Sequence, residues 1–418
     1  MKILLVTRGS QGDIYPYLAL AAELMQHGHS ITISLPRLFE EQAKALGASY
    51  FLQSYDDIAG MVEGNPSTKD LLDWTARVVD SQFDEMIPLL EEHDLLICSN
   101  TEFAASHVAE YCGKPHIRTC YAPLIPGKRV PPAVFPFLKP PYFLIGFQWA
   151  LLNAGLNLMV KKNINKNRAK LNMAPITDQG EYAPSNAHNY LMFSPHLGET
   201  DTEWNYAWSI GGYCFNDTFP YNEIALKNCM DFIKKDSRPT IFFTLGSCNA
   251  DDRDTFCERL FEICCDYNYK LVVGCGWWKV GTHLHNQDNL FLLDSAIPHY
   301  FILPECDAII HHGGSGTTHS AARSGKPQMV VPLLIDQFYW GSRVAKLGLG
   351  PRSIKIKIGK KALEKKILDL VKSPVYRQNA AALGEKIRNE QGIMNICEFI
   401  EQFALKNHVG LKTVNLPQ

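Results

Sequence analysis

The clearest chemical signal in the sequence is a glycine-rich loop in its second half, His311-His312-Gly313-Gly314-Ser315-Gly316-Thr317-Thr318. The loop directly follows an apolar run, 307–310, that is typical of a buried strand. Its glycines let backbone N–H groups approach a ligand closely, and a helix that begins near Thr317 would direct its positive end at a phosphate. His312 could donate a hydrogen bond to the same phosphate. The alternative is a tight turn followed by a threonine cap.

A carboxylate beside an amide follows at Asp336 and Gln337, after another apolar run. Aspartate accepts hydrogen bonds, and glutamine both accepts and donates them, so the pair can bind the vicinal hydroxyls of a sugar. Asp336 could instead cap the helix that follows it. A phosphate-binding loop followed by a polyol-binding pair indicates a sugar nucleotide. The GxxxxGK[ST] pattern of a P-loop does not occur in the sequence.

A second glycine-rich loop, Gly9-Ser10-Gln11-Gly12-Asp13, follows the first apolar run of the chain. Asp13 is our candidate for a general base that takes a proton from an incoming hydroxyl. Its structural alternative is the N-cap of a helix that begins at Ile14. His116 or His196 could substitute as the base, although buried structural histidines fit those positions better.

The elements that must position these residues follow from the alternation of strands and helices. Short apolar runs alternate with segments of helical periodicity in both halves of the chain, which predicts parallel sheets with helices on both faces. Ligands bind at the carboxyl ends of such strands. Both glycine loops lie there, and so does Leu245-Gly246-Ser247. We predict an α/β protein with two doubly wound, Rossmann-like domains and a cleft between them.

Composition limits the remaining classes. The 41 basic and 43 acidic residues nearly cancel, so no global field would hold nucleic acid. Twelve cysteines are scattered without CxxC spacing, which favours reduced thiols over disulfides or a zinc site. The first apolar run is too short for a signal peptide, so we expect a cytoplasmic protein.

The segments 311–351 and 9–29 resemble the UDP-glycosyltransferase superfamily of two-domain GT-B enzymes, which includes glycosyltransferase families 1 and 28. The pattern HHGG-x-GTT followed by DQ-x-x-W is similar to that of the sterol, lipid and antibiotic branch. The resemblance implies an N-terminal acceptor-binding domain at 1–210, a linker at 211–237, and a C-terminal nucleotide-sugar domain at 238–385. Helices at 386–418 would then cross back to the first domain.

The same resemblance implies an inverting transfer of a hexose, with glucose as the expected sugar, to a hydroxyl of a lipophilic acceptor. Acceptors of this kind include sterols, lipids and polyketide-like or aromatic aglycones. No metal or other cofactor is implied. The donor would be a UDP-sugar, with a dTDP-sugar as the alternative, because the tryptophan and glutamate of plant members have no obvious match. A non-hydrolysing sugar-nucleotide epimerase and a non-catalytic nucleotide-sugar-binding protein are the alternative functions.

Carried over position by position, the resemblance assigns roles to particular residues. Asp13 would be the catalytic base, where plant and animal members carry a histidine, and Gly9, Ser10 and Gly12 would form the loop around it. The donor diphosphate would be bound by Ser247, His312, Gly314, Ser315, Gly316 and Thr317. Asp336 and Gln337 would bind the sugar, and the base would lie near Ala296, Ile297 and Pro298.

One apolar segment remains outside these assignments. Residues 140–160 carry no formal charge and are long enough to span a bilayer. Two prolines, polar residues and a position inside an α/β domain argue against a span. Five basic residues follow within 161–170. We expect residues 140–170 either to make peripheral contact with an anionic membrane or to form a solvated helix beside the acceptor pocket.

Overall fold

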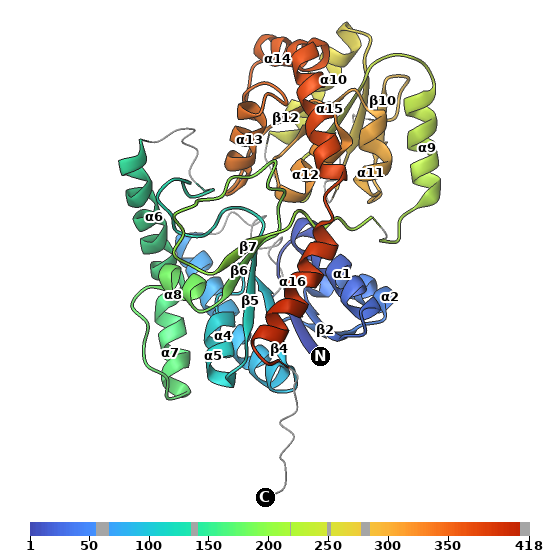
Figure 1. The fold of residues 1–418 in the computed structure, drawn as a ribbon. Coiled ribbons are helices and arrows are strands. Elements are labelled where there is room, and N and C mark those ends of the chain that lie inside the picture. Colours follow the sequence, from blue (N-terminus) through green and yellow to red (C-terminus); the bar gives the residue numbers. More distant parts are fainter. Residues whose placement is uncertain (56–66, 135–140, 218, 249–251, 277–284, 410–418) are drawn as a thin grey trace, which may run out of the picture.

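The computed structural model describes residues 1–55, 67–134, 141–217, 219–248, 252–276 and 285–409. Within them the chain forms two entirely parallel sheets with helices on both faces (Figure 1). The N-terminal sheet has the order β3-β2-β1-β4-β5-β6-β7 and the C-terminal sheet the order β10-β9-β8-β11-β12. The N-terminal strands are β1 (Lys2–Val6), β2 (Ser30–Leu35), β3 (Ser49–Leu52), β4 (Leu95–Ser99), β5 (His116–Cys120), β6 (His188–Leu191) and β7 (Trp208–Ile210). The C-terminal strands are β8 (Thr240–Thr244), β9 (Lys270–Gly274), β10 (Leu290–Leu293), β11 (Ala308–His311) and β12 (Gln328–Val330).

The strand order reverses at β1/β4 in one sheet and at β8/β11 in the other. At such switch points the loops diverge and leave a crevice at the carboxyl ends of the strands. The predicted glycine loops follow β1, β8 and β11, so they lie at these crevices. The predicted α/β class with two Rossmann-like domains is therefore confirmed, whereas the residue boundaries of the domains stay a prediction.

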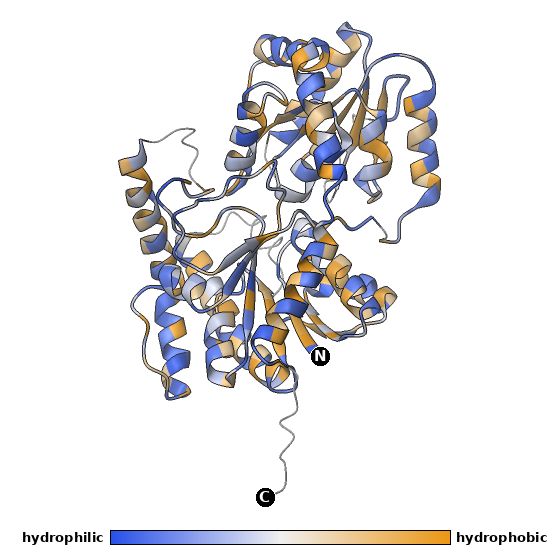
Figure 2. Ribbon diagram, in the orientation of Figure 1, coloured by the Kyte–Doolittle hydropathy of each residue, from blue (hydrophilic) through white to orange (hydrophobic). Residues whose placement is uncertain are grey.

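The residues of β1 show why this sheet is covered on both faces. Ile3 and Leu5 pack into a cluster with α1 (Gln11–Gln26), α2 (Glu40–Leu46) and α16 (Gly392–Lys406). Leu4 and Val6 pack into a cluster on the other face with α4 (Thr68–Glu91) and α5 (Ala105–Cys112). A strand buried on both faces reads as a continuous apolar run in the sequence. In Figure 2 the strand beside the N-terminus is hydrophobic, whereas the helices around the sheet carry both hydrophobic and hydrophilic residues.

The helices of the C-terminal sheet complete its two layers. On one face α10 (Arg253–Asp266) and α14 (Lys360–Lys372) pack against β8, and on the other α9 (Glu223–Lys234), α11 (His299–Ile302) and α12 (Ser315–Ser324) do so. The remaining helices here are α13 (Gln337–Lys346) and α15 (Pro374–Arg388).

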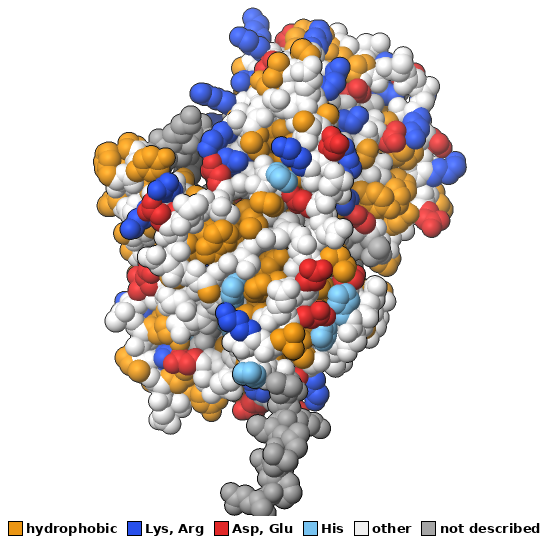
Figure 3. Space-filling view, viewed as in Figure 1, with side chains coloured by type: hydrophobic (Ala, Val, Ile, Leu, Met, Phe, Trp, Pro, Cys, Tyr) orange, Lys and Arg blue, Asp and Glu red, His pale blue; other side chains and the backbone are white. Residues whose placement is uncertain are grey.

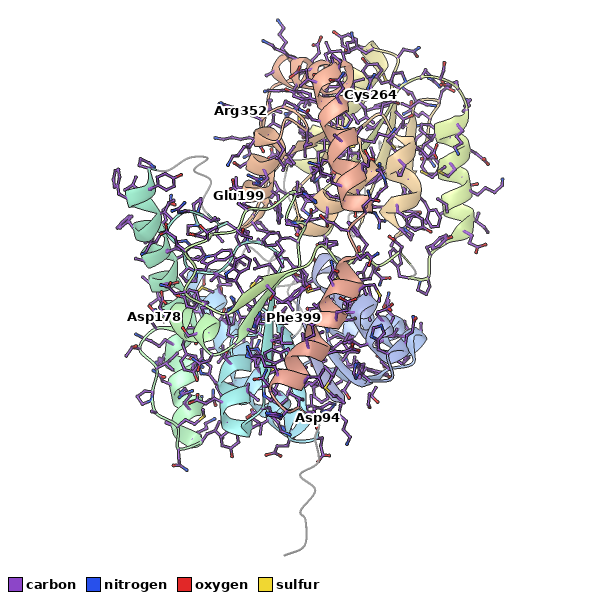
Figure 4. All side chains as sticks on the ribbon, in the orientation of Figure 1. Asp94, Asp178, Glu199, Cys264, Arg352 and Phe399 are labelled. Atoms are coloured by element: carbon purple, nitrogen blue, oxygen red, sulfur yellow. The ribbon has the colours of Figure 1, made fainter. Side chains whose placement is uncertain are left out.

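A further apolar cluster joins the two domains. It combines residues of β5, β6 and the segments that follow them with residues of α12, α13 and α15. At its centre the rings of Phe193 and Trp340 meet edge to face, with centroids 5.8 Å apart. Polar contacts border it: the Glu199 N–H donates to the Tyr339 hydroxyl at 2.7 Å, and Glu199 lies at the level where the domains meet (Figure 4).

The last described helix, α16, returns to the N-terminal domain (Figure 1). Phe399 packs on Tyr190 of β6, with ring centroids 5.0 Å apart. Glu401 bonds to His27 at 2.9 Å and to His29 at 3.2 Å, just beyond α1. Residues 410–418 of the predicted C-terminal segment lie outside the described residues.

The apolar segment after β5 is helical. The helix α6 (Tyr142–Leu156), the turn η2 (Asn157–Lys161) and α7 (Lys162–Lys170) form one continuous helix, next to α8 (Gln179–Ser185). By length and composition this helix could cross a membrane, but helices in the cores of soluble proteins can have the same length and hydrophobicity. Residue 140 lies outside the described residues.

Candidate active site

A cleft of about 400 Å³ lies between the domains, at the carboxyl ends of β1, β8 and β11. The structure brings almost all of the predicted site residues into it, and only Gly9 and Pro298 are not part of its wall. None of the described residues that line it comes from 142–170. The predicted residues that do line it are Ser10, Gly12, Asp13, Ser247, Ala296, Ile297, His312, Gly314, Ser315, Gly316, Thr317, Asp336 and Gln337.

Asp13 is the third residue of α1, because the helix begins at Gln11 and not at Ile14 as its N-cap alternative requires. Ser10 is the N-cap, and its N–H and hydroxyl donate to Asp13 Oδ2 at 2.8 and 3.2 Å. These bonds alone would lower the pKa of the carboxyl, but burial outweighs them and raises it to about 6. A carboxylate with that pKa is ionised near neutral pH and is a stronger base than an ordinary aspartate.

The turn around Asp13 depends on one glycine. Gly9 has a φ of 137°, and a Cβ at this position would lie 2.3 Å from Asp13 Oδ2. The backbone carbonyl of Asp13 is also fixed, since the Tyr121 hydroxyl donates to it at 2.9 Å. Gly9 therefore leaves space for the Asp13 carboxylate and does not itself line the cleft.

The N-terminus of α12 is open towards the cleft. The helix begins at Ser315, two residues before the predicted Thr317, and its N-cap, Gly314, has no side chain to bond the first N–H groups. The Ser315 hydroxyl donates instead to the Tyr121 carbonyl of the other domain at 2.9 Å. The uncapped N–H groups of Gly316 and Thr317 are thus available to an anion in the cleft.

His311 and His312 have different roles. The ring of His311 is fully used, because its Nε2 bonds to Gln328 Oε1 at 2.8 Å and its Nδ1 accepts from the Gly313 N–H at 3.1 Å. His312 is buried, and its Nδ1 has no hydrogen-bond partner among the described residues. Burial lowers the pKa of His312 to about 3, so the ring is neutral and can donate one N–H.

Asp336 faces the cleft from the C-terminal domain. It stands at the N-cap position of α13 but makes no capping bond; its Oδ2 accepts from the Trp340 indole N–H at 3.1 Å. Burial, and next the charge of Asp13, raise the pKa of Asp336 to about 7. The charge of Asp13 therefore acts on the Asp336 carboxyl across the cleft.

Gln337 holds the loop that carries Asp336. Its Oε1 accepts from the N–H groups of Leu333 and Leu334 at 2.7 and 2.9 Å. The next residue, Ile335, has a φ of 42°, which a β-branched residue rarely adopts. The Gln337 carbonyl oxygen thus stabilises a strained loop, and the amide N–H₂, which bonds Cys248 Sγ at 3.2 Å, is the part left for a sugar.

Tyr213 is a cleft residue that the sequence did not reveal. Its ring stacks on His319 of α12 at 4.6 Å, and Phe215 meets it edge to face. A Cβ on Gly316 would lie only 2.8 Å from its hydroxyl oxygen, so this hydroxyl lies at the open end of α12. Burial raises the pKa of Tyr213 well above its usual value, which keeps the hydroxyl a hydrogen-bond donor. Nothing in the spacing around 213 distinguishes this tyrosine from other linker residues.

Within the described ranges, no group of three or more His, Cys, Asp or Glu side chains is arranged to hold a metal ion. The polar groups that line the cleft include the carboxylates of Asp13 and Asp336 from different domains, the open N-terminus of α12, the neutral His312 ring and the Tyr213 hydroxyl. This set can bind a diphosphate on one side and deprotonate a hydroxyl on the other.

Comparisons with known proteins support the fold. Residues 3–116 match the glycosyltransferase family 28 N-terminal domain, and residues 283–399 match the erythromycin biosynthesis protein CIII-like C-terminal domain. Among solved structures, the glycosyltransferase of kitacinnamycin superposes with a TM-score of 0.72 at 18% identity, covering 96% of this chain and 98% of that one. The calicheamicin glycosyltransferase CalG4 gives 0.70 at 17% identity, covering 97% and 98%. The fold is thus that of a GT-B glycosyltransferase, as predicted.

Relatives known by sequence extend over both domains. The chain is 27% identical to the sterol 3-beta-glucosyltransferase UGT80B1 of Arabidopsis thaliana over 94% of its own length, and 24% identical to a sterol 3-beta-glucosyltransferase of Debaryomyces hansenii over 95%. It spans 66% of the plant protein and 26% of the yeast one. The chain belongs to the UDP-glycosyltransferase superfamily of GT-B fold.

Proposed function

We propose that this chain is an inverting glycosyltransferase that moves a hexose, with glucose as the expected sugar, from a nucleotide sugar to a hydroxyl of a lipophilic acceptor. The observation that carries the proposal is one cleft in which the Asp13 carboxylate and the uncapped N-terminus of α12 come from opposite domains. The sterol-glucosylating relatives support a sterol or similar acceptor. UDP is the expected nucleotide, and neighbours of this fold solved with thymidine diphosphate keep dTDP as the alternative.

In the proposed reaction, Asp13 takes the proton of the acceptor hydroxyl while the oxygen attacks the anomeric carbon. The bond from that carbon to the donor phosphate breaks, and the nucleoside diphosphate leaves with the electron pair. The base and the diphosphate site lie on opposite domains, so attack from the face opposite the leaving group inverts the anomeric centre. Asp336 and the Gln337 amide N–H₂ would orient the sugar hydroxyls.

The leaving diphosphate would be stabilised by hydrogen-bond donors of the protein. The open N–H groups of Gly316 and Thr317 and the neutral ring of His312 supply donors where negative charge develops. We therefore propose that transfer proceeds without a metal cofactor. Unchanged turnover after exhaustive treatment with EDTA would agree with this, and recovery of lost activity by added Mg²⁺ would contradict it.

We further propose a cytoplasmic location. The twelve cysteines are all free thiols, and most are buried, as expected in a reducing compartment. Fractionation of cells that express the tagged chain, with a protease-protection assay on any membrane-bound part, tests the location. A protease-shielded chain inside sealed vesicles would contradict it.

The catalytic step is tested with Asp13→Asn. The variant should bind UDP as the wild type does but lose about 10²–10⁴-fold in transfer, because a general base contributes an effect of that size. The assay measures release of UDP from UDP-glucose with a panel of sterol acceptors, together with product mass. Wild-type turnover in the variant would refute the role of Asp13. Epimerised UDP-sugar formed without any acceptor would instead replace the proposed function.

A further inference from the structure

The outer face of the α6–α7 helix is apolar and exposed. Phe143, Phe147 and Leu158 are 80, 65 and 76% exposed, and Tyr142 and Leu151 lie beside them at 75 and 53%. These residues recur at helical spacing, so they form one stripe. Figure 3 shows apolar side chains gathered at the N-terminal end of α6, on the outer edge of the molecule (Figure 1). A stripe of this size calls for a partner.

The opposite face of the helix is fixed to the N-terminal domain. Trp149 is buried, and its indole N–H donates to the Val130 carbonyl at 3.0 Å. Further along, Val160 and Ile164 belong to the core cluster under α4 and β4. If lipid surrounded the helix, these buried residues would have to leave the folded core. A membrane span is therefore excluded as long as the domain is folded, and only the outer stripe can meet a partner.

The stripe changes from apolar to basic along its length. Residues 142–160 carry no formal charge, and the exposed Lys162 and Lys166 continue the same face, with Lys170 beyond them. Of these three lysines, only Lys166 forms an ion pair among the described residues, with Asp80 at 3.0 Å. Arg168, which the sequence places in the basic cluster, is buried and paired with Glu110 at 2.6 Å, so it takes no part.

We propose that the outer face of 142–170 docks on the surface of a membrane that contains anionic lipid. The aromatic and leucine side chains enter the boundary between headgroups and acyl chains, and the lysines contact lipid phosphates. The charge pattern favours this occupant over a second copy of the chain, because a twofold pairing of antiparallel stripes would bring lysines onto phenylalanines. Docking itself does not depend on glycosyl transfer.

A connection to the cleft follows if the proposed function holds. The segment after β5 starts at Tyr121, which lines the cleft, and reaches Val130, which bonds to Trp149 beneath the stripe. A segment of about ten residues thus connects the cleft wall to the base of the helix whose outer face would dock. A lipophilic acceptor held in the bilayer would be collected at the surface on which the enzyme sits.

The docking test uses co-sedimentation with vesicles of pure phosphatidylcholine and of phosphatidylcholine with 30% phosphatidylserine. The wild type should bind the anionic vesicles, and high salt should weaken that binding. Phe143→Ser/Phe147→Ser should lower the partition coefficient at least tenfold, and Lys162→Glu/Lys170→Glu should lower it only for anionic vesicles. Ile224→Ser/Leu405→Ser, at residues 73% exposed on α9 and α16, is the matched control and should bind as the wild type does.

Three results would overturn the proposal. These are no binding of the wild type to anionic vesicles, equal binding of the phenylalanine variant, and sedimentation of the wild type as a dimer that this variant dissociates. Transfer to detergent-dispersed acceptor should stay unchanged in the phenylalanine variant, while transfer to vesicle-embedded acceptor should fall. Absence of both transfer activities in a wild type that still binds anionic vesicles would count against the proposed function and leave docking standing.

Discussion

Asp13 and Asp336 each hold a carboxyl at the cleft whose pKa is raised from 3.8, to about 6 and about 7. Burial is the main cause for both, and for Asp336 the neighbouring charge of Asp13 adds to it. A pair of acids in this state is costly to a folded protein when both are ionised. This loss of folding stability is consistent with a catalytic role, because a general base needs a pKa near the pH at which the enzyme works.

The cost has a measurable pH dependence. The folded chain keeps protons on these two carboxyls that the unfolded chain releases between about pH 4 and pH 7, so their contribution to stability is present at low pH and is lost as pH rises through this window. Asp13→Asn and Asp336→Asn should each reduce the fall in unfolding free energy between pH 5 and 7.5, measured with urea. Asp231→Asn, at an exposed site on α9, is the control. A variant with the wild-type slope would show that its carboxyl does not titrate there.

Tyr213 is the residue whose role the structure adds. Tyr213→Phe keeps the ring stacked on His319 and removes only the hydroxyl at the open end of α12. Calorimetry should show about a tenfold loss of UDP affinity, the size expected for one hydrogen bond to a charged group. Uridine, which has no phosphate, should bind both proteins equally. An unchanged affinity for UDP would remove the hydroxyl from the diphosphate site; binding of neither ligand by the wild type would count against the donor instead.

At the scale of elements, the chain passes between the domains twice, and the two connecting segments contact each other. One segment carries Tyr213, and the other leads into α16. Gly392 opens α16, and a Cβ there would lie 2.4 Å from the Tyr213 carbonyl oxygen. Gly212, with a φ of 108°, lies against the same turn. The backbone that carries Tyr213 into the cleft is thus held by the helix that returns to the first domain.

This contact gives Gly392→Ala an unusual sign. Helix propensity alone would make the change stabilising, since alanine is the better helix former. The clash with Tyr213 should dominate and cost about 1–3 kcal/mol in unfolding free energy, as overpacking does. Gly359→Ala, at the start of α14 with no atom within 4 Å, is the matched control. A stabilised Gly392→Ala would mean that the crossings move apart freely.

Most elements could be predicted because their signals are local. Buried parallel strands such as β1 and β8 are continuous apolar runs, and glycine loops at their ends reveal the cleft. Helix starts were less exact, because Ser10 caps α1 three residues before Asp13, and the N-cap of α12 is Gly314, which has no side chain to mark the start of the helix. The burial of single side chains could not be predicted from the sequence. Arg168 lies in a basic cluster typical of a surface but is buried, and Tyr213 reaches the cleft only through the packing of two segments that are distant in the sequence.

At the scale of the molecule, the domains share the apolar cluster around Phe193 and Trp340. Phe193 is fully buried and is covered by α13, so neither domain completes its surface alone. Two domains joined only by linkers would unfold separately, whereas a shared core couples them. We therefore expect the two domains that form the cleft to unfold together, as one cooperative unit.

Calorimetry can test this coupling. The wild type should unfold in one transition whose calorimetric and van't Hoff enthalpies agree. Phe193→Ala should cost about 3–5 kcal/mol and split the transition in two, because the cavity lies at the junction of the domains. Phe256→Ala removes an equally buried ring, but from the core between α10 and β8, so it should lower the transition temperature and keep a single step. Two transitions in the wild type, or one unsplit transition in Phe193→Ala, would show that the shared cluster does not couple the domains.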